Sequence, residues 1–413
     1  MLDMKSSLAP RVASRALHVT LPSNARLKNN DAPDFLAVPV YEAELWTSRQ
    51  RQASPIHEIS YRGCFKPQLP GYFVERLTRP GDLVYDPFSG RGTTAVEAAL
   101  RGRSVMANDV NPLSAILTYP RLELPSVTEI DARMRSLRFA AQAPSGMDLS
   151  MFFHPDTEYE LLGLREYLYR RMKSGKEDAA DRWIRMVATN RLTGHSPGFF
   201  SVYTLPPNQA VSAEDQMRIN ARLKQEPEYR DIRALILKKT MQLQGRLAAA
   251  ERWRLRKAAE DALLLSRDAR ATREIPSDSV QLTVTSPPFL DVIQYAKDNW
   301  LRCWFNGLDA DAIGARITMS KEAEGWAAEM SGVFAELHRI TRPGGWVAFE
   351  VGEVRRGEVK LDEIVAPIGL EAGFKCTAIL INAQRFTKTA NIWGVANNRL
   401  GTNSNRIVLF RKD

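Results

Sequence analysis

The chain of 413 residues is 44% hydrophobic and 25% charged, a composition typical of a globular protein with a sizeable core. It shows no apolar run of about 18 residues and no signal-peptide pattern, so we expect no membrane partner and a cytoplasmic location. Cys64, Cys303 and Cys376 lie far apart without CxxC spacing, which predicts neither a disulfide framework nor a metal site.

The positive charge of the chain indicates a class of partner. The formal net charge is +9 and the isoelectric point is near 9.4. Lys and Arg side chains that neutralise phosphates dominate nonspecific affinity for nucleic acids. Residues 151–260 hold 20 Lys and Arg against 14 Asp and Glu, so six of the nine excess charges lie there. A basic protein without such a partner stays open as the alternative.

The hydrophobic pattern, followed along the chain, predicts strands that alternate with helices. The first 50 residues show little periodicity and are expected to be an irregular lead-in. A short apolar run at 83–85, a Pro/Gly turn and a helix at 93–100 follow, and a second strand at 104–107 leads to Asp109. This alternation predicts an α/β fold with a doubly wound, mostly parallel sheet.

The middle of the chain has a different character and divides the predicted sheet in two. Charged helical windows such as 159–172 and 232–256 surround an unusual loop at 190–209. The strands and helix expected after them are 262–265, 280–285, 346–351, 361–372 (helix), 377–381 and 407–410, with a turn at 342–345. We therefore expect three regions: a lead-in and first half of the sheet domain at 1–120, an inserted helical domain at 121–260, and the second half at 261–413.

A glycine-rich turn between the first predicted strand and helix is the candidate cofactor site. Open α/β sheets bind ligands at the carboxyl ends of their strands, and Gly90 and Gly92 allow the backbone to approach a ligand closely. The helix N-terminus at Thr93 can offer free N–H groups to a carboxylate. Asp109 ends the second strand, where an acid can accept hydrogen bonds from both ribose hydroxyls. The candidate residues of the turn are Asp86, Pro87, Phe88, Ser89, Gly90, Gly92 and Thr93.

The segment DPFSGRGTT at 86–94 resembles motif I of amino-group DNA methyltransferases, which has a form close to DPFxGxGTT. This resemblance implies a Rossmann-like methyltransferase fold and S-adenosylmethionine as the cofactor. A P-loop would need GK followed by Ser or Thr, which is missing here. Upstream, FKPQLP at 65–70 resembles motif X, which closes over the methionine end of the cofactor and implies roles for Lys66 and Pro67. Asp268, in SRDA at 266–269, is similar to the motif III acid that contacts the adenine amino group; a strand-end cap is its alternative.

The segment SPPF at 286–289 follows a predicted strand and resembles motif IV of the same family. An exocyclic amine is a poor nucleophile because its lone pair is delocalised into the ring. Two acceptors at the amino hydrogens, Ser286 Oγ and the Pro287 carbonyl, would favour a tetrahedral nitrogen. Pro288 stiffens the turn, and Phe289 supplies a face on which a flipped base can stack. A carbon-5 cytosine methyltransferase would need a cysteine after a proline, and the sequence has none.

Serine at the first motif IV position resembles the cytosine-N4 group, so we expect transfer of a methyl group to cytosine N4 in double-stranded DNA. Adenine N6, an RNA amino group and a non-catalytic nucleic-acid-binding regulator stay open as alternatives. The sequence also leaves open a cognate restriction enzyme as a partner and either a monomer or a dimer.

The insertion lies between the second strand and motif III, whereas in the family's alpha arrangement the target-recognition domain usually follows motif III. We still expect residues 121–260 to read the DNA, because charge and polar loops gather there. A structural helical lid is the alternative. A second loop at 384–398 is expected to line the flipped base. The candidate DNA-binding residues are Arg191, His195, Asn208, Arg385 and Lys388. Glu350 and Glu353, at the end of a strand, are expected either to face the pocket or to be caps or solvated.

Overall fold

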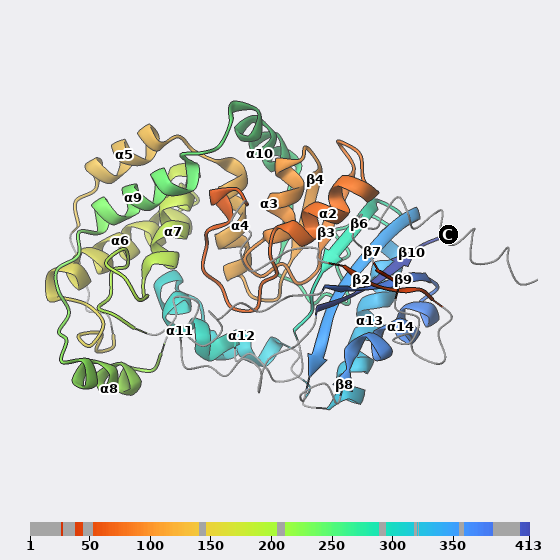
Figure 1. Ribbon diagram of the computed structural model, residues 1–413. Coiled ribbons are helices and arrows are strands. Elements are labelled where there is room, and N and C mark those ends of the chain that lie inside the picture. Colours follow the sequence, from red (N-terminus) through yellow and green to blue (C-terminus); the bar gives the residue numbers. More distant parts are fainter. Residues whose placement is uncertain are drawn as a thin grey trace, which may run out of the picture.

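The computed structural model describes residues 26–27, 38–43, 53–139, 146–204, 211–288, 295–317, 320, 322–354, 359–382 and 405–413. Figure 1 shows a sheet flanked by helices and a separate group of helices, α5 to α9, beside it. In the described part of the chain, no helix has the length and apolar character needed to cross a membrane.

The sheet has the strand order β1-β2-β9-β10-β7-β6-β3-β4-β5, and β8 pairs with β7. Neighbours from β7 to β5 are parallel, whereas β10 runs antiparallel between β7 and β9. The strands are β1 (Arg26–Leu27), β2 (Val40–Ala43), β3 (Leu83–Asp86), β4 (Ser104–Asn108), β5 (Leu263–Leu265), β6 (Val280–Thr285), β7 (Thr341–Val354), β8 (Val359–Lys360), β9 (Lys375–Asn382) and β10 (Asn405–Arg411). The predicted mostly parallel, doubly wound sheet is confirmed.

Side chains that alternate along the strands form two cores, one on each face of the sheet. On β10, Ile407 and Leu409 join the core with α2 and α3, whereas Val408 and Phe410 join the core with α13 and α14. The helices are α2 (Gln68–Leu77), α3 (Thr93–Leu100), α4 (Leu113–Glu123), α5 (Val127–Ser136), α6 (Pro155–Lys173), α7 (Ala179–Arg191), α8 (Ala213–Leu223), α9 (Ile232–Gln244), α10 (Ala249–Asp261), α11 (Tyr295–Asn306), α12 (Ala310–Arg316), α13 (Ala323–Ile340) and α14 (Leu361–Glu371), with a 3-10 helix, η2 (Pro55–His57).

The sheet changes direction at β3, and this places the site. From β3 the chain adds β4 and, after the helical segment, β5 on one side, and it then returns to add β6 and β7 on the other. The loops after β3 and β6 therefore diverge from neighbouring carboxyl ends, which is where doubly wound sheets bind ligands.

Three local predictions were wrong. Part of the lead-in is a strand, because β2 pairs with β9 and carries β1 at the sheet edge. The helical window at 232–256 is divided, since Gly245 caps α9 and α10 begins at Ala249. The expected turn at 342–345 belongs to β7, where Gly344 adopts φ 77° and the register against β6 shifts.

Candidate functional site

The loop after β3 turns sharply beneath the candidate cofactor site. Gly90 and Gly92 adopt φ values of 52° and 73°, in the left-handed region that favours glycine. A Cβ at Gly92 would lie 2.1 Å from Thr118 Oγ1 of α4, so the loop and this helix approach at a distance that only glycine permits. The loop therefore holds its shape against α4.

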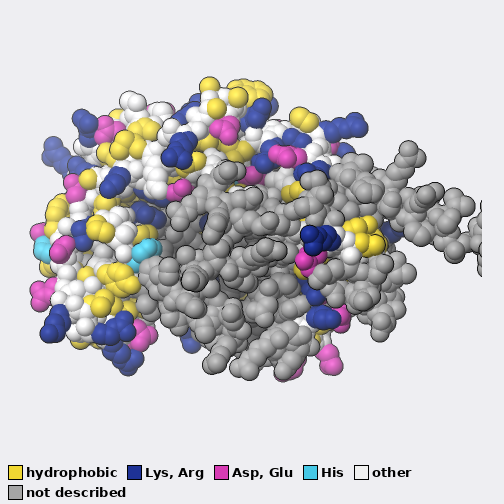
Figure 2. All heavy atoms as spheres, in the orientation of Figure 1, with side chains coloured by type: hydrophobic (Ala, Val, Ile, Leu, Met, Phe, Trp, Pro, Cys, Tyr) yellow, Lys and Arg dark blue, Asp and Glu magenta, His cyan; other side chains and the backbone are white. Residues whose placement is uncertain are grey.

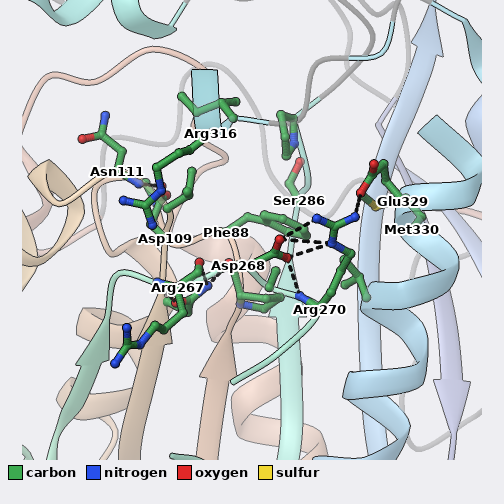
Figure 3. Close-up of a pocket in the computed structure, with 18 of the residues that line it drawn as sticks. Phe88, Asp109, Asn111, Arg267, Asp268, Arg270, Ser286, Arg316, Glu329 and Met330 are labelled. Atoms are coloured by element: carbon green, nitrogen blue, oxygen red, sulfur yellow. Dashed lines mark hydrogen bonds and ion pairs between the residues drawn. The ribbon is translucent and has the colours of Figure 1, made fainter. Parts of the chain in front are cut away.

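A cavity opens above this loop and also contains the start of the SPPF segment (Figure 3). Its walls come from the carboxyl ends of β3, β4, β5 and β6 and from α12 and α13. Lining residues from the sequence-predicted set are Pro87, Phe88, Gly90, Asp109, Asp268, Ser286 and Pro288. The structure thus brings residues from both halves of the sheet into one cavity.

Asp109 closes one side of the cavity and braces the glycine loop. Its Oδ2 accepts the Gly90 N–H at 2.8 Å, and its Oδ1 accepts the Asn111 N–H at 2.9 Å. Burial raises the pKa of Asp109 to about 6, although these two hydrogen bonds act in the opposite direction. Each oxygen keeps a lone pair, so the carboxylate can still accept ligand hydroxyls.

Asp268 is paired with a side chain that the sequence did not suggest. Arg270 Nη2 lies 2.6 Å from Asp268 Oδ2, and Arg270 also pairs with Glu329 of α13. Figure 3 shows the guanidinium lying between the two acids. Hydrogen bonds from Arg270 lower the pKa of Asp268, so this acid is a charged acceptor at the cavity wall.

Asn108, which precedes Asp109, connects three loops and was missed from the sequence. Its Nδ2 donates to the carbonyls of Pro87 and Arg267 at 3.2 and 3.0 Å, and its Oδ1 accepts the Arg267 N–H at 2.9 Å. Its own carbonyl accepts the Ser89 N–H at 2.9 Å. Only the position at a strand end could have suggested this residue.

Asp86 connects the cofactor loop to the strand that precedes SPPF. Its Oδ1 accepts the Thr285 hydroxyl at 2.6 Å, and the Thr94 hydroxyl donates to the Val284 carbonyl at 3.0 Å. Burial raises the pKa of Asp86 to about 7. Asp86 is buried and does not line the cavity, so the structure places it behind the site.

Ser286 lies beside a buried acid, Glu350, near the end of β7. The Ser286 and Asn405 side chains both hydrogen-bond the Glu350 carboxyl group. Burial raises the pKa of Glu350 to about 7 despite these bonds. The Trp326 indole of α13 donates to the Pro288 carbonyl at 3.0 Å, which fixes the SPP turn. Glu350 is therefore not solvated: it is buried behind Ser286 and does not itself line the cavity.

Other predicted cofactor residues do not line the cavity. Lys66 is exposed and Pro67 caps α2, whereas Tyr61 and Gly63, which the sequence analysis did not select, line the cavity. Ser89 and Thr93 are buried in the loop and at the start of α3. The aromatic Tyr61, just upstream of FKPQLP, is the sequence feature that could have indicated this part of the cavity wall.

Of the predicted DNA-binding residues, Arg191 is buried and His195 is partly exposed, and the others lie outside the described residues. Arg191 is buried, with its guanidinium 3.9 Å above the Phe199 ring and bonded to Asn190. His195 lies partly exposed at the start of a loop tip, 195–198, in which Ser196 and Pro197 are exposed. The other predicted DNA-binding residues lie outside the described residues: Asn208, Arg385 and Lys388. Phe289 and the side chain of Glu353 lie outside them as well.

The charge distribution on the visible face does not single out one docking surface. Figure 2 shows Lys and Arg side chains interspersed with Asp and Glu over the helical segment. Among the described residues, no group of three or more His, Cys, Asp or Glu side chains is arranged to hold a metal ion.

Residues 34–115 match the N6/N4 family model described as DNA methylase. This segment of the chain is similar to the family, and the match covers about a fifth of the chain. A type II methyltransferase, M.MjaII from Methanocaldococcus jannaschii, is 34% identical over 77 residues, which are 18% of this chain and 14% of that relative. The chain thus matches only a small part of the relative's length. The family match contains the glycine loop and Asp109 and ends before Ser286.

Solved methyltransferase structures resemble the chain only distantly. The rRNA methyltransferase AviRa from Streptomyces viridochromogenes is 15% identical, with a TM-score of 0.34, over 86% of this chain and 89% of that one. A TehB-like S-adenosylmethionine-dependent methyltransferase from Corynebacterium glutamicum is 8% identical, with a TM-score of 0.31, over 83% and 87%. The fold assignment therefore rests on the strand order itself.

Proposed function

We propose that the protein transfers a methyl group from S-adenosylmethionine to the N4 amino group of cytosine in double-stranded DNA. One observation supports this most: Ser286 and Pro288 line the same cavity as the glycine loop, Asp109 and Asp268. An amino acceptor held at Ser286 is therefore within the cavity that would hold the methyl donor. A purely nucleic-acid-binding protein would not need this combination.

The donor set of the cavity fits an adenosine-containing cofactor. Asp109 offers carboxylate acceptors to the two ribose hydroxyls, and Asp268 offers an acceptor to the adenine amino group. The left-handed turn at Gly90 brings backbone rather than side chain to the ligand. When bound, S-adenosylmethionine supplies an electrophilic methyl group on a sulfonium, and the protein contributes its placement in line with the amine.

In this proposal Ser286 and the buried Glu350 beside it take up the proton that the amino group must lose. Ser286 Oγ accepts one amino hydrogen and the Pro287 carbonyl the other, which directs the nitrogen lone pair towards the methyl group. As the N–CH3 bond forms and the S–CH3 bond breaks, the amine becomes positively charged and releases a proton. Glu350, hydrogen-bonded to Ser286, accepts this proton through the serine hydroxyl.

DNA contacts in this proposal come from the inserted helices and from base flipping. The loop from Arg191 to Thr204 is held by backbone hydrogen bonds, with Phe200 N–H to Arg191 O at 2.9 Å and Thr204 N–H to Gly194 O at 3.1 Å. Its exposed tip at 195–198 offers His195 and Ser196 to a base edge or phosphate. Phe289 would supply the stacking face for the flipped cytosine.

Mass spectrometry of nucleosides tests the reaction and the base. Double-stranded DNA is incubated with the purified chain and S-adenosylmethionine that carries a labelled methyl group. We expect labelled N4-methylcytosine. Label only in N6-methyladenine would contradict the base assignment, label only in RNA would move the substrate to RNA, and no label on either would favour a non-catalytic regulator.

The Ser286→Ala variant tests the role of the serine. General acid–base groups contribute about 10²- to 10⁴-fold, so we expect the rate of methyl transfer at saturating cofactor to fall at least about a hundredfold. Ser331→Ala is the matched control, because Ser331 is an exposed serine on α13 that bonds only its own helix. A wild-type rate for Ser286→Ala would remove this serine from the mechanism.

A further inference from the structure

An exposed tryptophan lies on α10. Trp253 is 66% exposed, the largest exposed fraction among the large hydrophobic side chains of the described residues, whereas the other tryptophans that the structure describes are buried or half-buried. An indole normally gains free energy by leaving water. Leu255 and Ala258, on the opposite side of α10, pack into the core. The helix therefore directs Trp253 into solvent.

Positive charge surrounds this indole. Residues 246–257 hold five Lys and Arg against one Asp or Glu. Arg256 and Lys257 follow Trp253 by three and four residues, so they share its face of the helix, and Arg254 lies at the flank of that face. All three cations are exposed. The indole therefore has cations on either side.

The acids near this face compensate only part of the charge. Glu260 pairs with Lys257 at 2.6 Å. Glu251 of α10 and Glu129 of α5 each accept a backbone N–H at the start of their own helix, at 2.8 and 2.7 Å. In the described part of the chain, no carboxylate is bonded to an arginine of α10.

The arginines beside Trp253 are held in place by backbone carbonyls. Arg254 Nη1 donates to the Leu100 carbonyl at 3.2 Å, and Arg256 donates to the Leu124 carbonyl at 3.2 Å through Nε and at 3.0 Å through Nη2. A guanidinium has five N–H donors, so each arginine keeps donors for a phosphate. The two charges are thus fixed in position and exposed to a ligand.

This face lies on the side of the molecule opposite the cavity. Leu100 ends α3 and Leu124 follows α4, and both helices begin beside the cavity and end at α10. In Figure 1, α10 lies at the top, whereas α12, which contributes to the cavity wall, lies at the bottom. A ligand bound at α10 is therefore separate from a base held in the cavity.

We propose that this face of α10 is a second nucleic-acid site, which binds a single strand by stacking a base on Trp253 and pairing phosphates with Arg254 and Arg256. The inference goes beyond the proposed reaction and does not depend on it. Bases in a duplex stack on one another, so a single strand is the form that offers a base to an exposed indole. A protein partner would need a wider apolar centre, and the other exposed apolar residues of α10 are alanines.

The test is the binding of a labelled oligothymidylate to the purified chain, measured by fluorescence anisotropy. Thymine has no exocyclic amino group, so this probe does not require the chemistry of the cavity. We expect Trp253→Ala to weaken binding at least about fivefold, as for the loss of one stacked base, and Trp253→Phe to retain most of the affinity. Replacing Arg254 and Arg256 together by Gln should lower the slope of log Kd against log salt by about 1.4, since each phosphate contact on a single strand contributes about 0.7.

Tyr159→Ala is the matched control, because Tyr159 of α6 is an aromatic residue that is also exposed, and it should leave binding unchanged. Trp253 is exposed, so its replacement should leave the Tm unchanged. Equal binding by the wild-type and Trp253→Ala chains would overturn the site. Polyglutamate that displaces the probe as well as unlabelled oligothymidylate of the same charge would overturn it in favour of an acidic protein partner. A chain that binds the probe through Trp253 but transfers no methyl group would contradict the proposed function alone.

Discussion

Asp86, Asp109 and Glu350 share a buried environment at one edge of the sheet. Each lies at or near the carboxyl end of a strand, and burial raises their pKa values to about 7, 6 and 7. Acids with raised pKa values near neutrality are suited to proton transfer, and they cluster at functional sites. Of the three, only Glu350 bonds the serine assigned to the reaction.

Replacing Glu350 by Gln is expected to remove a pH dependence. Because Glu350 must lose its proton to accept one, the wild-type kcat should rise as pH increases through about 7. In Glu350→Gln the kcat should be at least about a hundredfold lower at pH 8 and the inflection near 7 should disappear. The measurement is a pH profile of kcat between pH 5.5 and 9 at saturating cofactor.

Glu336→Gln is the matched control, because Glu336 is also buried but bonds Thr272 and Arg339 away from the cavity. Its profile should keep the wild-type inflection. An unchanged inflection in Glu350→Gln would show that another group sets the pH dependence.

Sequence patterns predicted residues that line the cavity but not the residues whose hydrogen bonds position them. Asp109 and Ser286 follow strands within family motifs, so their place could be predicted. Asn108 acts through carbonyls of loops that only the fold brings together, and Glu350 is joined to Ser286 by the pairing of β6 with β7. Arg191 was expected in a loop, yet it ends α7 and its packing on Phe199 buries it.

The glycine loop and α4 approach each other closely at Gly92. Thr118 faces Gly92, and its hydroxyl is buried with no hydrogen-bond partner in the described structure. The helix therefore supports the loop through shape at this position. Arg121, one turn further along α4, adds hydrogen bonds to the same support.

Gly92→Ala is expected to destabilise the protein and weaken cofactor binding. The left-handed backbone costs an alanine about 1–2 kcal/mol, and the collision with Thr118 adds to this cost, so we expect a total of about 2–4 kcal/mol in urea unfolding. Adding Thr118→Ala should recover the collision part only. Gly175→Ala, at φ 66° with no atom nearby, should show the backbone cost alone. Equal effects of Gly92→Ala and Gly175→Ala would contradict the tight contact.

At the level of elements, apolar period and turn residues predicted the central strands and the helices that flank them. The sequence analysis did not predict the strands at the sheet edge, because β2 is short and its stability comes from pairing with β9. The sequence analysis did not predict the register shift in β7, because a Pro-Gly-Gly sequence is typical of a turn. Only the neighbouring strands show that pairing continues through it.

Across the molecule, the raised acids give stability a dependence on pH. The unfolded chain ionises Asp86 near its usual pKa, whereas the folded chain keeps the proton until about pH 7. The folded state therefore binds more protons between these values, and this contribution to stability is lost as pH rises through about 7. His57 and His338, whose pKa values are lowered mainly by burial, act in the opposite sense, so the comparison must be between variants.

The Asp86→Asn variant isolates the contribution of Asp86 ionisation to stability, because an amide oxygen can still accept the Thr285 hydroxyl. We expect the ligand-free variant to have a higher Tm than the wild-type chain at pH 8 and no such advantage at pH 5, measured by thermal unfolding. Glu350→Gln should behave in the same way. An advantage for Asp86→Asn that is equal at both pH values would indicate that Asp86 is not protonated in the folded state.

The hydrogen bonds of the site join residues that are remote along the chain: 159 residues separate Asn108 from Arg267, and 199 separate Asp86 from Thr285. Closing such loops costs entropy before any contact is gained, and it slows folding. The inserted helices, rich in local contacts, can form earlier. During synthesis the glycine loop leaves the ribosome long before its partner strand β6, so the site can assemble only late in folding.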